Sequence, residues 1–346
     1  MRVSVAFVVF YASLLLSVGC SSSSSTGTSI PEARKAPIQR FVAERQPWSY
    51  QGYDGWTYYT PGATIRTTIS DRRMLIRIPA FVELAQLHAR TALTVLPAPP
   101  QPVDTYFLGS RQQWETMTKK VLKERAPVYL AIERGGFSLG STGVYYDLGP
   151  RDSFTIAAHE GWHQYAHSVM TDRIPVWLDE GIACYLEGFR WDAVDPDSPN
   201  FLPWANLERF DQLRNASRSG QLMSLHTLVT NRPQDLMATD QGGNRALTYY
   251  AQHWALIHFF REYQNGRYAT GLARVLHLAV RGELYESMSE SDARTLRIRR
   301  SGAGVLSIIA PGVPLRELDR QYQEFIGDIV RTGGRDAILS GRSPVQ

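Results

Sequence analysis

The chain has 346 residues, of which 43% are hydrophobic and 20% are charged. This composition is typical of a folded protein of one large or two ordinary domains, and it excludes a disordered chain. The formal net charge of +4 is spread along the sequence, so we expect no nucleic-acid partner. We interpret the densest basic stretch as a solvated loop or helix face and assign it no function; it contains Arg294, Arg297, Arg299 and Arg300.

Residues 1–20, MRVSVAFVVFYASLLLSVGC, have one early arginine and then a mostly apolar, uncharged run. The run is too short to span a membrane and is typical of a signal peptide. Its end resembles a bacterial lipoprotein signal, which implies that Cys20 becomes the lipidated first residue of the mature chain. Ser17 departs from that pattern, which usually has leucine there. An ordinary secretory signal cut nearby is the alternative, and both interpretations predict export.

A lipid on Cys20 implies a protein of the bacterial cell envelope that is anchored to the membrane. Ser21 stands where aspartate would retain a lipoprotein in the inner membrane, so we expect an outer-membrane lipoprotein facing the periplasm or the exterior. The serine-rich segment that follows predicts a flexible tether over residues 21–46. Cys184 is the only other cysteine, so lipidation of Cys20 would leave no intrachain disulfide.

Residues 47–152 predict a β-rich N-terminal lobe, and residues 153–340 predict a helical lobe. We expect strands around a Pro-Gly turn in 56–69, in 103–109, in 128–133 and in 137–149. We expect helices in the second half of 71–96 and, after a serine cap, in 110–126. The fold class is therefore α+β, with a small mixed sheet leading into a mostly helical lobe.

Residues 155–170, TIAAHEGWHQYAHSVM, contain two histidines four positions apart with a glutamate beside the first. On a helix, His159 and His163 share one face, so both imidazoles can face one metal ion. Glu160 lies beside them as a general base, which is the H-E-x-x-H arrangement. A catalytic zinc site needs a further ligand. We consider His167 a poor one, because a straight helix cannot easily bring three successive turns around one ion.

A better third ligand lies in residues 174–188, IPVWLDEGIACYLEG. Pro175 separates this segment from the preceding helix, and we expect an amphipathic helix after it. A turn and an antiparallel return would bring Glu180 opposite His159 and His163. Two histidines and a glutamate are an established set of ligands for catalytic zinc.

These two motifs, H-E-x-x-H and W-L-D-E-G-x-A-x-Y, resemble the gluzincin metallopeptidases. Together with YYAQHWALIHFF (249–260), they are most similar to a bacterial family of peptidase-MA-like proteins, over residues 100–280. The resemblance implies a zincin-like helical lobe that carries the H-E-x-x-H helix, packed on a sheet with an edge strand. The G-A-M-E-N motif by which aminopeptidases bind a substrate amine is absent, and the ligand spacing is two residues shorter.

The resemblance implies a role for each site residue. His159, His163 and Glu180 hold zinc, which lowers the pKa of its bound water, and Glu160 accepts the water's proton. Tyr250 stabilises the oxyanion, with Tyr249 and His253 as rivals; core packing is an equally simple explanation of this helix.

The sequence leaves open the roles of three further features. Asp179 either orients a histidine ligand or lies at the surface, and Cys184 either approaches the metal or is a small buried residue. Residues 140–149 form either the edge strand along which zincins bind an extended peptide or an interior strand.

The sequence therefore predicts a zinc-dependent hydrolase of peptide bonds, most simply an endopeptidase, acting on a peptide or protein substrate. The alternative is an inactive or weakly active lipoprotein that uses the same fold as a binding or assembly module in the cell envelope. The intact set of His159, His163, Glu180 and Glu160 favours the enzyme.

Overall fold

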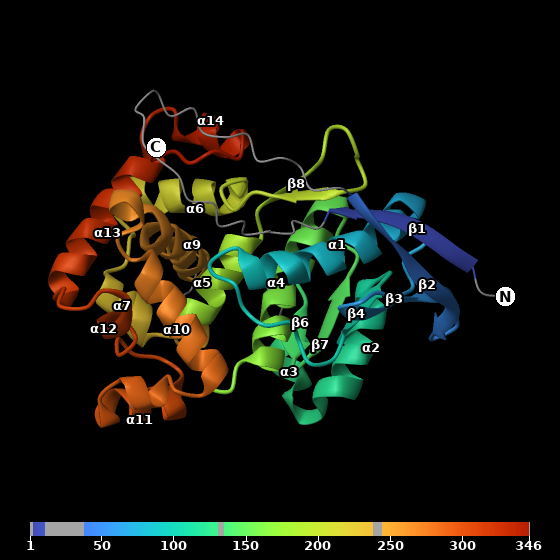
Figure 1. Ribbon diagram of the computed structural model, residues 1–346, viewed down its shortest axis with the longest axis horizontal. Helices are drawn as coiled ribbons and strands as arrows, with labels where there is room; N and C mark the ends of the chain where they lie inside the picture. The colour runs from blue at the N-terminus through green and yellow to red at the C-terminus, as the bar shows by residue number, and fades with distance from the viewer. Residues whose placement is uncertain (1–2, 11–37, 131–134, 238–243, 346) are drawn as a thin grey trace, which may run out of the picture.

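The computed structural model describes residues 3–10, 38–130, 135–237 and 244–345. It is an α+β protein in which strands dominate the first half and helices the second, which confirms the predicted fold class (Figure 1). Helices α4 and α5 lie between the sheet and the later helices, so the H-E-x-x-H segment stands where the two parts meet. In the described ranges, no helix has both the length and the apolar character needed to cross a membrane.

The main sheet is mixed and has the strand order β1-β2-β3-β4-β5-β7-β6. Neighbouring strands from β1 to β4 are antiparallel, β4, β5 and β7 are parallel, and β6 runs antiparallel to β7 at the edge. A second, two-stranded sheet pairs β8 with β9. The strands are β1 (Val3–Phe10), β2 (Ile38–Tyr50), β3 (Tyr53–Tyr59), β4 (Ala63–Thr67), β5 (Val103–Leu108), β6 (Phe137–Leu139), β7 (Thr142–Tyr146), β8 (Phe189–Trp191) and β9 (Pro199–Phe201).

Helices pack on both faces of the main sheet. Buried residues of α1 and α4 form one core with inward-facing residues of the sheet, and α2 covers part of the opposite face. The α-helices are α1 (Arg72–Thr91), α2 (Arg111–Leu122), α3 (Ala126–Leu130), α4 (Pro150–Val169), α5 (Val176–Leu186), α6 (Leu207–Arg218), α7 (Leu225–Thr230), α8 (Pro233–Met237), α9 (Asn244–Gly266), α10 (Ala269–Arg281), α11 (Glu290–Arg299), α12 (Leu306–Ile309), α13 (Leu315–Val330) and α14 (Gly334–Leu339). Short 3₁₀ turns occupy Lys123–Arg125 and Tyr285–Ser287.

Strand β1 lies inside the segment 1–20 that we interpret as a signal peptide, and it pairs with the first part of β2. Strand β2 begins inside the segment 21–46 that we expected as a tether. Removal of a signal peptide would leave the six strands from β2 onward in the sheet. Cys20 lies outside the described residues, so its lipidation stays a prediction.

The predicted elements of the N-terminal lobe are confirmed in part. The Pro-Gly turn between β3 and β4 and the cap that Ser110 gives α2 are both present. Helix α1 is longer than predicted, because the Asp71 side chain accepts a hydrogen bond from the Met74 amide and starts it earlier. The helix then continues through Pro79, although an interior proline costs about 3 kcal/mol. Burial of its apolar face offsets that cost.

Two predictions about secondary structure were wrong. The strand expected over 128–133 is replaced in its first part by α3, which continues directly from the preceding 3₁₀ turn and leaves Val128 69% exposed. Residues 131–134 lie outside the described chain. Helix α5 is not amphipathic, because α4 and α9 both pack on it, and only Val176 and Glu180 of its residues are partly exposed.

Candidate metal centre

Helix α4 carries both histidines of the H-E-x-x-H motif on one face. It begins at Pro150, whose missing N–H costs nothing at the first helical position, after Gly149 with φ of 90°. The helix runs unbroken through Gly161 to Val169. The His159 and His163 rings therefore lie one turn apart, with their centroids separated by 5.1 Å.

Glu180 of α5 faces both histidines. Its Oε2 lies 3.4 Å from His159 Nε2 and 3.7 Å from His163 Nε2. One ligand atom from each of the three residues lies within 4.8 Å of the other two, a group able to hold a metal ion. The structure therefore brings together the three residues predicted as metal ligands, and two imidazoles with a carboxylate suit zinc.

Helices α4 and α5 run antiparallel, as the side-chain pairs along them show. His163, late in α4, meets Asp179, early in α5, and His159 meets Glu187 just beyond the end of α5. Gly181 allows α9 to approach on the other side: a Cβ there would lie 3.1 Å from the Ile257 side chain and 3.2 Å from the His253 carbonyl oxygen. The glycine next to Glu180 thus permits the close packing of α5 on α9.

The remaining ring nitrogen of each histidine is bound to a carboxylate. His159 Nδ1 lies 2.8 Å from Glu187 Oε1, and His163 Nδ1 lies 3.2 Å from Asp179 Oδ1. An ionised carboxylate only accepts hydrogen bonds, so Nδ1 carries the proton and donates in both pairs. Both Nε2 atoms, which face Glu180, are then the positions at which each ring takes up either a second proton or a metal ion, as outer carboxylates commonly arrange for metal-binding histidines.

The carboxylate behind His159 is held by the first turn of α6. Asn206 caps that helix by accepting from the Arg209 amide, and its Nδ2 donates to Glu187 Oε2 over 2.7 Å. Arg209 adds two hydrogen bonds, from Nε to Glu187 Oε2 at 3.0 Å and from Nη2 to Glu187 Oε1 at 2.8 Å. This forked arrangement fixes the orientation of the carboxylate plane.

The carboxylate behind His163 is held by residues from two parts of the chain, α4 and the residue that ends α11. Asp179 Oδ1 also accepts from Trp162 Nε1 at 2.9 Å, and Oδ2 accepts from Arg300 Nη2 at 3.0 Å. Arg300 donates further to the Ile174 carbonyl, and its own carbonyl accepts from the Val176 amide. Our interpretation of Arg300 as part of a solvated basic face was therefore wrong, because it holds the start of α5 and its aspartate.

The electrostatics of the site favour a bound cation. Burial lowers the pKa of His163, but the Asp179 and Glu180 charges outweigh it and raise that pKa to about 10. Burial raises the pKa of Glu180, yet the two histidines hold it well below its usual range. Arg209 and Arg300 balance the charges of Glu187 and Asp179, so the charge of Glu180 is left for the protonated histidines or a metal ion.

Glu160, the predicted general base, is partly exposed beside the sheet. Burial, and then the nearby Glu160 charge, raise the pKa of Tyr145 on β7. Glu160 thus follows His159 on α4 and lies near β7, which leaves its carboxylate outside the three-ligand group.

Tyr250, the first of the three predicted oxyanion donors, lies beside the His159 ring. Its ring centroid is 6.5 Å from that of His159, and burial, followed by the Glu180 charge, raises its pKa well above the usual value. The Tyr249 hydroxyl instead donates to the Asn231 carbonyl. His253 is fully buried with Nδ1 on the Tyr249 carbonyl oxygen, and burial lowers its pKa to about 4.

Two other predicted residues have clear surroundings. His167 lies outside the ligand group, with its Nε2 3.3 Å from Arg173 Nη1. Cys184 is fully buried and lies with His159 and Glu187 in a second group of potential ligands.

The strand formed by part of 140–149 is interior, because β7 has β5 on one side and β6 on the other. The edge strand on this side of the sheet is β6.

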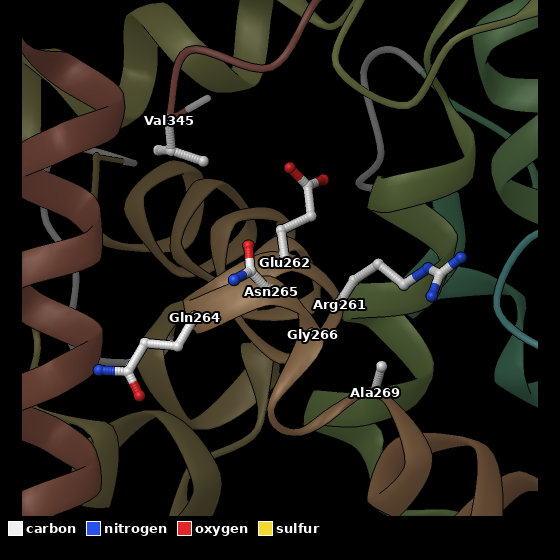
Figure 2. Close-up of a pocket in the computed structure, with 7 residues that line it drawn as sticks. All are labelled: Arg261, Glu262, Gln264, Asn265, Gly266, Ala269 and Val345. Atoms are coloured by element: carbon white, nitrogen blue, oxygen red, sulfur yellow. The ribbon is translucent and has the colours of Figure 1, made fainter. Parts of the chain in front are cut away.

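The hollow at the C-terminal end of α9 is separate from this site (Figure 2). The first of its lining residues along α9, Arg261, is about 16 Å from Tyr250 at a rise of about 1.5 Å per residue. Glu262 points toward Val345 there, and its carboxylate accepts hydrogen bonds from Trp204, His258 and Ser343. These bonds give Glu262 a structural role at the C-terminal segment.

The sequence did not reveal Glu187, Arg209 or Arg300 as site residues. Glu187 follows Glu180 by seven positions, or about two helical turns, and that spacing was the one available signal. Arg209 is three residues after the cap Asn206, a spacing that serves many ordinary helices. Arg300 is over a hundred residues from the motifs, and nothing local marks it.

The comparisons with known proteins locate the same segment. A family described as "Protein of unknown function (DUF1570)" matches residues 153–279. No curated protein matches the chain. The matched segment holds the candidate ligands and the Glu187–Arg209 pair, and it ends before Arg300.

Proposed function

We propose that this chain is a zinc-dependent hydrolase of peptide bonds of the gluzincin type, most simply an endopeptidase. The observation that carries the proposal is the convergence of His159, His163 and Glu180, whose ligand atoms lie within 4.8 Å of one another. The carboxylates on both Nδ1 atoms support it, because they leave both Nε2 atoms available toward Glu180.

When bound, zinc supplies Lewis acidity and activates water for attack on the amide. Glu160 accepts the proton of the attacking water and returns it to the departing amine. Tyr250 donates a hydrogen bond to the oxygen that becomes negatively charged, because burial keeps its phenol protonated. An endopeptidase is the simplest form, since the chain lacks the aminopeptidase motif that binds a free amino terminus.

The test combines metal analysis with one substitution. Purified protein should contain about one zinc per chain and should cleave members of a broad peptide library. Glu160→Gln should keep the metal and reduce hydrolysis by roughly 10²–10⁴-fold, because an amide accepts no proton. Glu290→Gln, at an exposed position of α11, is the matched control and should behave as wild type.

Two results would count against this proposal. A parallel loss of zinc from Glu160→Gln would make the glutamate a ligand and overturn its assigned role. A metal-loaded wild type that cleaves no peptide would favour the binding or assembly module instead.

We also propose that the protein is exported and anchored through lipid on Cys20, as a lipoprotein of the outer membrane. The support is the pattern of residues 1–20 and the serine at position 21. Wild-type protein should partition into detergent and fractionate with outer membranes, whereas unchanged processing and membrane association of Cys20→Ala would refute the anchor.

A further inference from the structure

Arg209 contacts two residues that have proposed roles at the candidate metal centre. Its guanidinium binds Glu187, the partner of His159, and its Cζ also lies over the Tyr250 ring, 5.4 Å from the centroid. The side chain is 15% exposed, and that of Glu187 is 3% exposed. A single, mostly buried cation therefore touches the residue that orients a proposed metal ligand and the residue proposed to stabilise the oxyanion.

We propose that Arg209 is a positioning residue that couples His159 to Tyr250. This inference rests on the proposed function, in which His159 holds the metal and Tyr250 donates to the oxyanion. The forked bond to Glu187 fixes the plane of the carboxylate and hence the direction of the His159 ring. The contact with the Tyr250 ring places the phenol relative to that same histidine.

The shape of the guanidinium is essential to this role. Nε and Nη2 bind the two oxygens of Glu187, and Nη1 lies 3.3 Å from Gln212 Oε1. A lysine could supply the charge but not two parallel hydrogen bonds and a flat face for the ring. A buried ion pair adds little net stability compared with apolar packing, so the expected consequence of the pair lies mainly in geometry.

The experiment compares Arg209→Met and Arg209→Lys with Arg320→Met. Arg320 is a matched control because it binds Glu317 through the same two nitrogens, at 2.9 and 2.6 Å, on the exposed surface of α13. Cobalt serves as the metal probe, with its dissociation constant measured by chelator competition and its geometry by visible absorption. The Tyr250 ring is followed by NMR of ¹³C-labelled tyrosine in metal-free protein, with its signal assigned by its loss in Tyr250→Phe.

Arg209→Met should weaken cobalt binding by about 10- to 100-fold, the usual effect of losing an outer partner of a histidine ligand. It should also alter the cobalt spectrum and shift the Tyr250 signal. Arg209→Lys should recover part of the affinity but not the Tyr250 signal, and Arg320→Met should match wild type in every measurement. Unchanged affinity, spectrum and Tyr250 signal in a folded Arg209→Met protein would overturn the proposal.

Arg209→Met leaves the Glu187 charge buried without its partner, which can prevent folding. The double variant Glu187→Gln with Arg209→Met removes both charges and should fold, with the same weakened cobalt binding and shifted Tyr250 signal. Wild-type affinity in the folded double variant would also overturn the proposal. A wild type that takes up no metal would instead overturn the proposed function, and the Tyr250 signal would still decide whether Arg209 positions that ring.

Discussion

His159 and His163 are both backed by a carboxylate and an arginine, but the two arrangements differ in depth and in origin. Glu187 and Arg209, behind His159, are 3% and 15% exposed, whereas Asp179 and Arg300, behind His163, are 13% and 30% exposed. Arg209 donates hydrogen bonds to both oxygens of Glu187. Arg300 donates to one oxygen of Asp179 and also to the Ile174 carbonyl.

The difference indicates that the two histidines depend on different parts of the chain. The His159 side is built from the end of α5 and the first turn of α6, both within the segment 153–279 that matches a known family. The His163 side needs the end of α11, outside that segment. We therefore expect the His159 side to be the more rigid and the His163 side to depend on the packing of the C-terminal part.

The largest effect is expected from the removal of Glu180, which faces both histidines. Glu180→Ala should lose most of the bound zinc, because Glu180 is the one carboxylate in the three-ligand group with both histidines. His163→Ala should do the same, measured as zinc per chain after dialysis. His167→Ala is the matched control on the same helix and should keep its metal. Full occupancy in Glu180→Ala would point to His167 or to another ligand.

The second prediction compares the two carboxylates directly. In metal-free protein, Glu187→Ala should lower the free energy of unfolding by about 3–5 kcal/mol, the usual result of leaving one charge of a buried pair alone. Asp179→Ala should cost less, because Arg300 is more exposed and water can solvate it. Urea denaturation of both variants gives the comparison. An equal or larger loss for Asp179→Ala would reverse our ranking of the two sides.

The third prediction concerns acid. Burial raises the pKa of both carboxylates, but Arg209 and His159 bring that of Glu187 to about 2, and His163 and Arg300 bring that of Asp179 to about 2. Both lie below the ordinary values of 4.5 and 3.8, so their stabilisation is complete above about pH 4.5 and is lost as the pH falls toward 2.

For Glu187 this loss is on the order of 3 kcal/mol. Measured from pH 6 to 2 in metal-free protein, the unfolding free energy of Glu187→Gln should fall less steeply than that of wild type. The stabilisation that His163 contributes depends on pH in the opposite direction. Its pKa is raised to about 10, so this contribution to the free energy of unfolding is complete below about pH 6.5 and is lost as the pH rises through 10. Parallel acid profiles for wild type and Glu187→Gln would contradict the role of Glu187.

The parts that the sequence predicted well are those determined by local pattern. The placement of His159 and His163 on one face follows from helical geometry, and Pro175 was enough to predict that a second helix follows. The position of Glu180 opposite them was predicted from the expected antiparallel return of that helix, although the helix is not amphipathic as predicted. The exposed face assigned to Arg300 was wrong because its partner, Asp179, is distant in sequence. Only the packing of α11 beside the start of α5 brings the two together.

The N-terminal lobe shows the same limit in its secondary structure. Residues 128–130 have strand propensity, but the helical turn directly before them continues through to Leu130. In α1, the unfavourable interior Pro79 is tolerated because the Asp71 cap and the burial of the apolar face stabilise the helix. Propensity predicts an element well when tertiary packing agrees with it, and these two elements are the places where it does not.

The smallest expected effect concerns Cys184, which belongs to the His159 side. Its thiol lies with His159 and Glu187 in a second group of potential ligands, so it tests which group holds the ion. Burial, and then the Glu187 charge, raise the pKa of the thiol, which keeps it protonated, and a protonated thiol is a poor metal ligand. Glu187 Oε1 is also already occupied by His159 and Arg209.

Cys184→Ser should therefore keep its zinc and most of its activity. We expect a loss of about 1 kcal/mol in unfolding free energy, because a hydroxyl is costlier to bury than a thiol. Cobalt-loaded wild type should show no sulfur-to-cobalt charge-transfer band, and Cys184→Ser should give the same spectrum. Loss of metal in a folded Cys184→Ser protein would instead assign the ion to the group of His159, Cys184 and Glu187. Arg209 would then compete with the ion for the Glu187 carboxylate.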